Sequence, residues 1–467
     1  MRWPDGRRQL EYDEVIAMLF ARHDLLEIVR ATAADTMPPL YYWLLHLWGG
    51  GYDVAWARGL SLLFGVAAIP VVYLLGRHLL GEVPALAGAG LMALSPFPVF
   101  YGHFARMYAL LALLGLLAVL FFNRWLGGGR RRDLFAFTLC AGLSLYVHNL
   151  GLLLIVALDV LFLLERKNAW RPLAAAHVAM VIAYAPWLLY LPGQLEKVNR
   201  AFWIPTPGLT ELVRTPMLFL FHLPLPDVLV PPAAFVGLLC LAITIAETRR
   251  RWLAAPRARG GLLSLAAVAA APVVLMYAVS FIRPIYVERA VLASAGAYYL
   301  LLAGAFWRMP IRPLALTVTA VVLVAGAAAH GYQYGYESFP RSPYYALADQ
   351  LGSQVRPGEV LLHDNKLSYF PTYLLAPDLP QAYLPDPPGS PNDTLAQGTI
   401  DVLRLPPMSL EQAVAGRQRI WFVLYKRSLD EASGSPANKV WLDQRYRSDQ
   451  ATQIGDLLVY IYYVGTL

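Results

Sequence analysis

Two adjacent carboxylates, Asp13 and Glu14, lie near the start of a very apolar chain, in the segment RQLEYDEVIAML at residues 8–19. A carboxylate within hydrogen-bond reach of a reacting hydroxyl can act as a general base. Successive residues of a helix diverge by about 100°, so only one of the two can face a reaction centre. We expect Asp13 to face the reaction centre and Glu14 to cap the helix or orient its neighbour. The structural alternative is an exposed acidic helix start, because Asp and Glu favour that position.

Three arginines, Arg58, Arg106 and Arg289, stand at ends of apolar segments. Cations in such places can stabilise negative charge that develops on a departing group. Arg106 comes with Tyr108 in ARMY, and Arg289 follows YVE. The alternative is that these long side chains only snorkel to lipid headgroups.

Three further polar residues are weaker candidates for the same site. His148 closes an apolar segment, His103 lies in a short turn, and Asp35 precedes TMPP. A lone histidine is more often a packing residue than a catalyst. We expect His148 and His103 to line the site and Asp35 to help bind an acceptor.

The composition indicates a membrane protein. Hydrophobic residues make up 58% of the 467 residues and charged residues only 15%, well below the quarter that is usual for soluble proteins. The net charge of +7 is typical of cytoplasmic loops and does not indicate nucleic-acid binding. Cys140 and Cys240 lie inside apolar runs, which favours packing over a disulfide or a metal site.

Ten apolar runs of roughly membrane-spanning length follow the lead-in, some of them short. One set of their connections holds fifteen Lys and Arg; the other holds four, Lys197, Arg200, Arg214 and Arg283. The positive-inside rule therefore places the first set in the cytoplasm. The expected spans are 57–79, 84–99, 105–124, 134–148, 149–165, 172–191, 230–247, 262–281, 288–306 and 312–330.

This orientation predicts three regions of a polytopic α-helical membrane protein in the plasma membrane. Residues 1–56 form an external loop whose amphipathic segment 13–30 is an interfacial helix, and residues 57–330 form the membrane core. Residues 331–467 form an extracytoplasmic soluble α/β domain. In it EVLLH, IWFVLY and LLVYIYYV are expected strands, and PYYALADQLGSQV is an expected helix.

The order of several strings resembles the GT-C class of integral-membrane glycosyltransferases, specifically the protein O-mannosyltransferase and 4-amino-arabinose lipid A transferase group. The strings are YDE at 12–14, PPLYYWLLHLW at 38–48, SPFPVFYGHFARMYALLALL at 95–114, YVHNLGLLLI at 146–155 and RPIYVERAVL at 283–292. The resemblance implies an enzyme that moves a sugar from a polyprenyl phosphate to a hydroxyl of a lipid, protein or polysaccharide, on the outer face of the membrane. It places Asp13 as the base, with Arg106, Tyr108, Arg289 and Arg58 on the donor phosphate.

The leaving group that the resemblance implies is a lipid phosphate, so no cofactor is required. A divalent cation is compatible with the sequence but not indicated by it. The family also implies a transmembrane helix before the acidic loop. The sequence as given shows none, and we expect a start upstream of residue 1.

Two departures from the family pattern bear on activity. Relatives commonly have His before the double proline, where this chain has Met37, and an acidic residue before ARMY, where it has His103 and Phe104. A non-catalytic relative is therefore one alternative. A transporter or lipid flippase is another, although apart from Asp159 and His177 the span centres are free of charge and the candidate charges gather at one face.

Overall fold

The computed structural model describes residues 10–165, 169–200, 204–223, 225–335, 343–388, 394–426 and 436–464. The first nine residues of the expected external loop and short stretches of the expected C-terminal domain lie outside the described residues.

The lead-in forms three short helices: α1 (Tyr12–Phe20), α2 (Leu25–Ala34) and α3 (Leu40–Leu47). The expected single interfacial helix over 13–30 is wrong, because the chain turns at residues 21–24. There Asp24 caps α2, its carboxylate accepting from the amides of Leu26 and Glu27 at 2.9 and 2.8 Å. α1 is also buried on nearly all sides, so it is an internal helix and does not lie on a surface.

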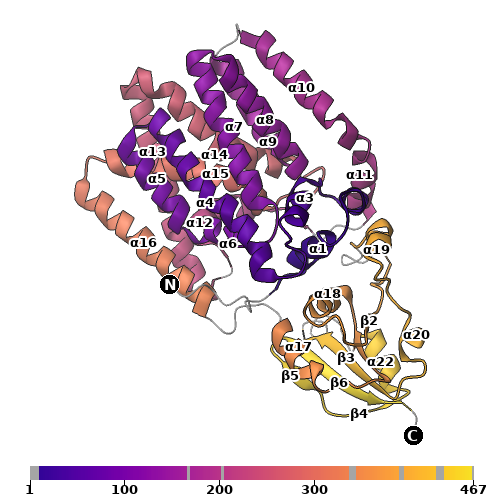
Figure 1. The fold of residues 1–467 in the computed structure, drawn as a ribbon. Helices are drawn as coiled ribbons and strands as arrows, with labels where there is room; N and C mark the ends of the chain where they lie inside the picture. The colour runs from indigo at the N-terminus through magenta and orange to yellow at the C-terminus, as the bar shows by residue number, and fades with distance from the viewer. Residues whose placement is uncertain are drawn as a thin grey trace.

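The long helices form a bundle, shown in indigo to salmon in Figure 1. Their order is α4 (Val54–Leu79), α5 (Glu82–Leu94), α6 (Pro96–Gly102), α7 (Tyr108–Gly128), α8 (Arg131–Val147), α9 (Gly151–Glu165), α10 (Trp170–Leu188), α11 (Leu191–Arg200), α12 (Leu209–Phe221), α13 (Val230–Ala254), α14 (Arg259–Val279), α15 (Leu292–Arg308) and α16 (Arg312–Gly335). Short 3-10 turns η2 (Asp227–Leu229), η3 (Pro256–Ala258) and η4 (Glu288–Val291) precede α13, α14 and α15.

Within the described residues, six helices are long and apolar enough to cross a membrane, or up to eight if two bent pairs each count as one span. These helices make the chain a multi-pass membrane protein. Every expected span contains a helix, but α8 and α9 are short, with 17 and 15 residues. The number ten therefore stays a prediction.

Prolines mark the two bends. The expected span 84–99 is divided into α5 and α6, which meet at 58° where Pro96 follows Ser95. The expected span 172–191 similarly ends in a 61° bend between α10 and α11, where Pro192 follows Leu191. A proline has no amide hydrogen to donate to the preceding turn and its ring clashes with that turn, so a break just before Pro96 and Pro192 is expected.

Small residues let the central helices approach closely. α15 is buried along nearly its whole length. Its Leu300 packs against α4 and α5 at Gly76 and Gly88, where an added Cβ atom would meet Leu300 Cδ2 at 2.5 and 2.6 Å. Packing through small residues is the usual way in which membrane helices associate, because lipid supplies no hydrophobic force between them.

The C-terminal part of the chain forms a sheet with flanking helices. The strand order is β2-β1-β3-β6-β4, with β5 paired to β6; β1 is parallel to β2 and β3, and β6 is antiparallel to β3. The elements are α17 (Tyr344–Gly352), β1 (Glu359–His363), α18 (Lys366–Leu375), β2 (Gln381–Tyr383), α19 (Gln397–Leu403), α20 (Leu410–Val414), β3 (Arg419–Tyr425), α22 (Ala437–Asp443), β4 (Arg447–Ser448), β5 (Thr452–Ile454) and β6 (Leu457–Tyr463). EVLLH, IWFVLY and LLVYIYYV all lie in strands, as predicted.

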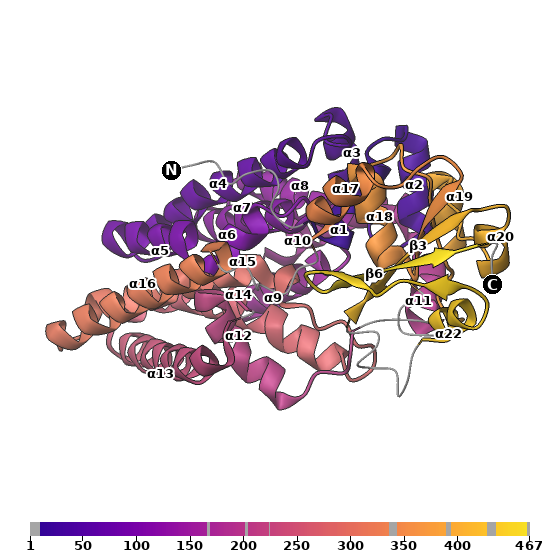
Figure 2. The same ribbon diagram turned by 90° about the horizontal axis from the view of Figure 1, so that it is seen from below.

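The lead-in helices lie between the bundle and the sheet (Figures 1 and 2). The rings of Tyr12 on α1 and Phe370 on α18 meet edge to face, with centroids 6.0 Å apart. The Thr399 hydroxyl on α19 donates to the Ala31 carbonyl on α2 at 3.3 Å. One apolar core runs through all three parts, which fixes α1 against both of its neighbours.

Candidate functional site

A cavity of about 360 Å³ lies at the end of the bundle that faces the lead-in helices. Segments far apart in the sequence contribute to its wall: α1, the turns before α3, α7, α9 and α15, helix α11, and residues Thr394 and Leu395 before α19. These are the loops that charge patterning assigns to one side of the membrane. The polar residues around it include Asp13, Asp35, Arg106, Tyr108, His148, Asn149, Gln194, Lys197, Arg283 and Arg289.

Asp13 projects into the cavity from the first turn of α1. Its side chain is 36% exposed, and its Oδ2 lies 3.6 Å from Nη2 of Arg289. The carboxylate is therefore accessible and lies beside a cation. Arg289 in turn lies over the ring of Tyr108, 5.3 Å from the ring centre.

Arg106 is held firmly although it lies in a turn. Its Nη1 donates to the Tyr42 hydroxyl at 3.1 Å and to the backbone carbonyl of Asp13 at 3.3 Å. Its own carbonyl accepts from Ser61. Its Nε is buried and has no hydrogen-bond partner within the described residues, although it belongs to a side chain that lines the cavity. A buried donor of this kind is costly unless a ligand satisfies it.

Glu14 points away from the cavity and ties α1 to its surroundings. Its side chain is 1% exposed and accepts from Arg58 Nε at 2.9 Å, from Arg58 Nη2 at 2.6 Å and from the Ala105 amide at 2.9 Å. Arg58 does not line the cavity. The structure thus places Arg58 and Glu14 behind the site, where they position the Arg106 turn against α1. Phosphate contact by Arg58, which the sequence led us to expect, does not fit this placement.

His148 lies in the turn between α8 and α9 and lines the cavity as a neutral side chain. Burial, and then the positive charges of Arg106 and Arg289, lower the pKa of His148 to about 3. Its Nδ1 lies 3.1 Å from the Leu150 amide, which donates to it, so the ring proton is assigned to Nε2. That Nε2 is buried without a partner in the described structure, and it is available to donate to a bound ligand.

Asp35 and Lys197 form an ion pair at 2.5 Å in the cavity wall. Gln194, one turn before Lys197 on α11, donates to the Thr32 carbonyl at 3.2 Å and brings α11 against α2. Arg283 adds an exposed cation to the wall. We did not single out Lys197, Arg283 or Gln194 from the sequence. A signal existed for two of them, because Lys197 and Arg283 are among the four basic residues of the sparsely charged set of loops.

The two departures from the family pattern occupy different environments. Met37 lines the cavity and puts an apolar side chain where relatives commonly have His. Phe104 is buried against the rings of Phe100 and Tyr108 and does not itself line the cavity. His103 Nδ1 lies 2.7 Å from the Val99 carbonyl, and the structure does not bring His103 to the cavity.

Within the described ranges, no group of three or more His, Cys, Asp or Glu side chains is arranged to hold a metal ion. Cys140 and Cys240 are both buried free thiols.

Comparison with known proteins supports the class indicated by the sequence. Residues 36–190, about a third of the chain, match the family model described as dolichyl-phosphate-mannose-protein mannosyltransferase. No curated protein sequence matches the chain.

Solved structures share the fold over nearly the whole chain. ArnT from Cupriavidus metallidurans in the apo state aligns with a TM-score of 0.63 and 16% identity, over 98% of this chain and 93% of that one. Its complex with undecaprenyl phosphate aligns with a TM-score of 0.62 and 17% identity, over the same shares of the two chains. The archaeal oligosaccharyltransferase AglB from Archaeoglobus fulgidus, in complex with an inhibitory peptide and a dolichol-phosphate, aligns with a TM-score of 0.52 and 12% identity. The alignment covers 97% of this chain and 70% of that one.

The resemblance to the GT-C class of integral-membrane glycosyltransferases is thereby confirmed, by a family match in the first half of the bundle and by the fold of almost the entire chain.

Proposed function

We propose that this protein is a glycosyltransferase that moves a sugar from a polyprenyl-phosphate donor to a hydroxyl acceptor. The observation that carries the proposal is the single cavity in which an accessible carboxylate, Asp13, lies beside the cations Arg106 and Arg289. Sugar transfer needs both kinds of group close to C1 of the sugar, a base for the attacking acceptor oxygen and cations for the departing phosphate. A transporter needs no such pairing at one membrane face.

In the proposed reaction the acceptor oxygen bonds to C1 of the sugar while the bond from C1 to the phosphate oxygen breaks. Asp13 takes the acceptor proton, and the lipid phosphate leaves with the bonding electrons. Arg106 and Arg289 stabilise the growing negative charge on this phosphate, in a cavity where water is partly excluded. His148, being neutral, adds a hydrogen bond from Nε2 without adding charge.

The donor class is supported by the complexes of the related folds, since ArnT binds undecaprenyl phosphate and AglB binds a dolichol-phosphate. The cavity is suited to an amphiphile, because Ile16, Leu191, Leu195, Ile204 and Val279 supply apolar wall beside the cations. The proposed acceptor is a hydroxyl of a lipid, a protein or a polysaccharide.

We propose that the cavity opens on the outer face of the membrane, in agreement with the low basic charge of the loops around it. Residues 1–56 are then the external loop, 57–330 the membrane core and 331–467 the extracytoplasmic domain. Thr394 and Leu395 bring this last part to the cavity wall, which supports a role in acceptor binding.

The test is sugar transfer by purified protein in detergent, using radiolabelled hexosyl and pentosyl polyprenyl phosphates with lipid, peptide and polysaccharide acceptors in parallel. We expect label to leave one donor class and to appear in one acceptor class. A protein that is folded and binds polyprenyl phosphate, yet releases sugar from no donor with any acceptor, would be the non-catalytic relative instead.

A further inference from the structure

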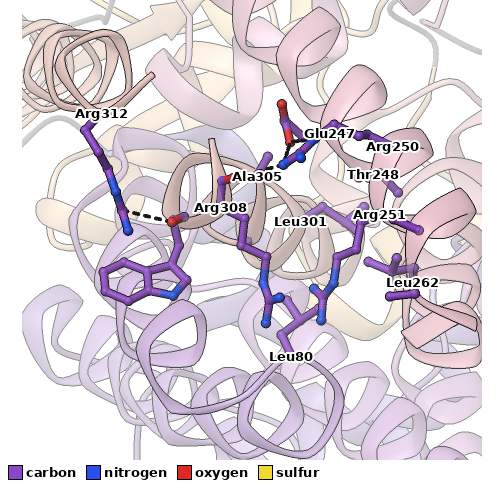
Figure 3. A pocket seen from close by; sticks show the side chains of 14 residues that line it. Leu80, Glu247, Thr248, Arg250, Arg251, Leu262, Leu301, Ala305, Arg308 and Arg312 are labelled. Atoms are coloured by element: carbon purple, nitrogen blue, oxygen red, sulfur yellow. Dashed lines mark hydrogen bonds and ion pairs between the residues drawn. The ribbon is translucent and has the colours of Figure 1, made fainter. Parts of the chain in front are cut away.

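A second cavity, of about 500 Å³, lies at the other end of the bundle. Figure 3 shows the side chains that line it. It is formed where α13 and α15 end and α16 begins, with Leu80 and Leu262 from neighbouring helices. Its wall contains four arginines, Arg250, Arg251, Arg308 and Arg312, and a single carboxylate, Glu247. Nothing in the proposed transfer reaction uses these residues.

Two of the four arginines have structural partners. Arg250 pairs with Glu247 at 2.6 Å and donates to the Arg308 carbonyl at 2.9 Å. Arg312 donates to the Trp307 carbonyl at 3.0 Å, and its guanidinium lies 5.1 Å from the centre of the Trp307 ring. These contacts cap the carboxyl end of α15, as basic side chains commonly do.

Arg251 and Arg308 have no such explanation. In the described part of the chain neither forms an ion pair, and Arg251 Nε is buried without a hydrogen-bond partner. Both side chains reach the space beside Leu80 (Figure 3), and the charge of Arg308 acts on Arg251. Arg251 is half-buried and Arg308 is exposed. Two like charges that lie on the same apolar surface repel each other, and an anion bound between them would relieve that repulsion.

The position of the cavity indicates which anion. α15 has 17 residues, which corresponds to a length of about 25 Å. Arg289 and Arg308 flank its two ends, so the two cavities are separated by close to the thickness of a bilayer core, about 30 Å. The lining residues Leu80, Leu262 and Leu301 are apolar. A ligand with a phosphate head and an apolar body fits this combination, because guanidinium groups bind phosphate oxygens in a bidentate manner.

We propose that this cavity binds the phosphate head of an anionic glycerophospholipid in the leaflet opposite the candidate active site. The phosphate lies between Arg251 and Arg308, and the acyl chains leave along the exposed apolar faces of α13 and α16. The proposal does not depend on the transfer reaction, because it concerns the other end of the bundle.

The test is lipid binding by the full-length protein purified in detergent. Phosphatidylglycerol, phosphatidylcholine and inorganic phosphate are titrated separately, with bound lipid counted by native mass spectrometry and the thermal midpoint measured alongside. The variant is Arg251→Gln with Arg308→Gln. The matched control is Arg249→Gln with Arg257→Gln, which removes the same charge from exposed positions that do not line the cavity. Arg308→Lys is a milder variant, which keeps the charge but loses the planar guanidinium that can donate two parallel hydrogen bonds.

We expect wild type and control to bind phosphatidylglycerol alike and to gain thermal stability from it, with little gain from phosphatidylcholine. The double variant should bind at least about tenfold more weakly, and Arg308→Lys should fall between, since a bidentate contact to a charged group is lost. Equal binding by the double variant and the control would overturn the proposal. Stabilisation by inorganic phosphate equal to that by phosphatidylglycerol would also overturn it, and would assign the cavity to a soluble phosphate.

Discussion

The two arginines beside Asp13 in the candidate active site make different contacts. Arg106 donates to the Tyr42 hydroxyl and to the backbone carbonyl of Asp13, whereas Arg289 lies 3.6 Å from the Asp13 carboxylate and over the Tyr108 ring. Arg289 is therefore the cation that lies beside the proposed base.

Replacing Arg289 by Gln should weaken the binding of sugar-free polyprenyl phosphate about 10- to 100-fold. This range corresponds to the loss of a hydrogen bond to a charged group, worth about 1.5–3 kcal/mol. Equilibrium binding in detergent measures the effect. Arg404→Gln is the control, because Arg404 is 75% exposed and pairs with Glu27 away from the cavity. Unchanged affinity in Arg289→Gln would remove Arg289 from the donor site.

The sequence predicted a large part of the site at this scale. Asp13, Asp35, Arg106, Tyr108, His148 and Arg289 were named from their types and positions, and all line one cavity. Lys197 and Gln194 were not named from the sequence, because their contribution to the site depends on the bend that turns α11 back against α2. Arg58 was expected on the donor phosphate, but its ion pair with Glu14 lies behind the cavity. Glu14 was expected to cap or orient, and its contacts in the structure fit that expectation.

At the scale of elements, α1 is the helix on which the site depends. It carries Asp13 on one side and Glu14 on another, and Glu14 anchors both α4 through Arg58 and the Arg106 turn through the Ala105 amide. The arrangement explains why two adjacent carboxylates can have different tasks. One is exposed to the cavity, and the other holds the helix that presents it.

Replacing Glu14 by Gln should lower the free energy of unfolding by about 3–5 kcal/mol, because it removes the buried carboxylate that pairs with the largely buried charge of Arg58. Thermal unfolding in detergent measures the loss. Asp13→Asn is the matched control: it makes the same chemical change one residue earlier, at a carboxylate that is 36% exposed, and should shift the midpoint little. Equal midpoints for the two variants would contradict the anchoring role.

A second prediction concerns the contact between α2 and α19. A Cβ atom at Gly398 would meet the Cβ of Ala34 at 2.9 Å, so Gly398→Ala should push α19 away from α2 and cost about 1–3 kcal/mol. The same change at Gly352 has open space around it and serves as the control. Limited proteolysis should show faster cleavage near α19 in Gly398→Ala only. Identical cleavage in both variants would show that this contact does not hold the C-terminal sheet in place.

At the scale of the whole molecule, some features of the fold are predictable from the sequence, and others depend on chain direction and on contacts between distant segments. Apolar periodicity and length located the helices of the bundle and the strands β1, β3 and β6. The bends at Pro96 and Pro192 and the division between α1 and α2 were missed, because hydropathy does not register a change of direction. The contact of the C-terminal sheet with α1 and α2 depends on surfaces that lie far apart in the chain, and no local pattern predicts it.

The whole fold should lose stability in mild acid. Burial lowers the pKa of His363 in the sheet to about 3, from an unfolded value near 6.5. Between these values the unfolded chain binds a proton that the folded chain does not. The free energy of unfolding therefore decreases as the pH falls, by up to about 1.4 kcal/mol per pH unit for each such histidine.

The test is to compare the thermal midpoints of wild type and His363→Gln at several pH values from roughly 7.5 to 4.5, on both sides of the ordinary histidine pKa of about 6.5. The variant is expected to be less stable at neutral pH, because it loses the contact of His363 Nδ1 with the Ser368 hydroxyl, 3.0 Å away. Its midpoint should nevertheless fall less steeply on acidification. Parallel profiles would show that His363 does not contribute to the acid sensitivity.

The most direct test of Asp13 as the general base is the rate of sugar transfer by Asp13→Asn, measured together with the affinity of the same variant for polyprenyl phosphate. We expect a rate lower by about 10²- to 10⁴-fold, as is typical when a general base is removed, with the affinity nearly unchanged. Asp35→Asn changes the second carboxylate that lines the cavity in the described part of the chain, and it should retain most of the rate at saturating acceptor. A wild-type rate in Asp13→Asn together with a large loss in Asp35→Asn would move the base from Asp13 to Asp35.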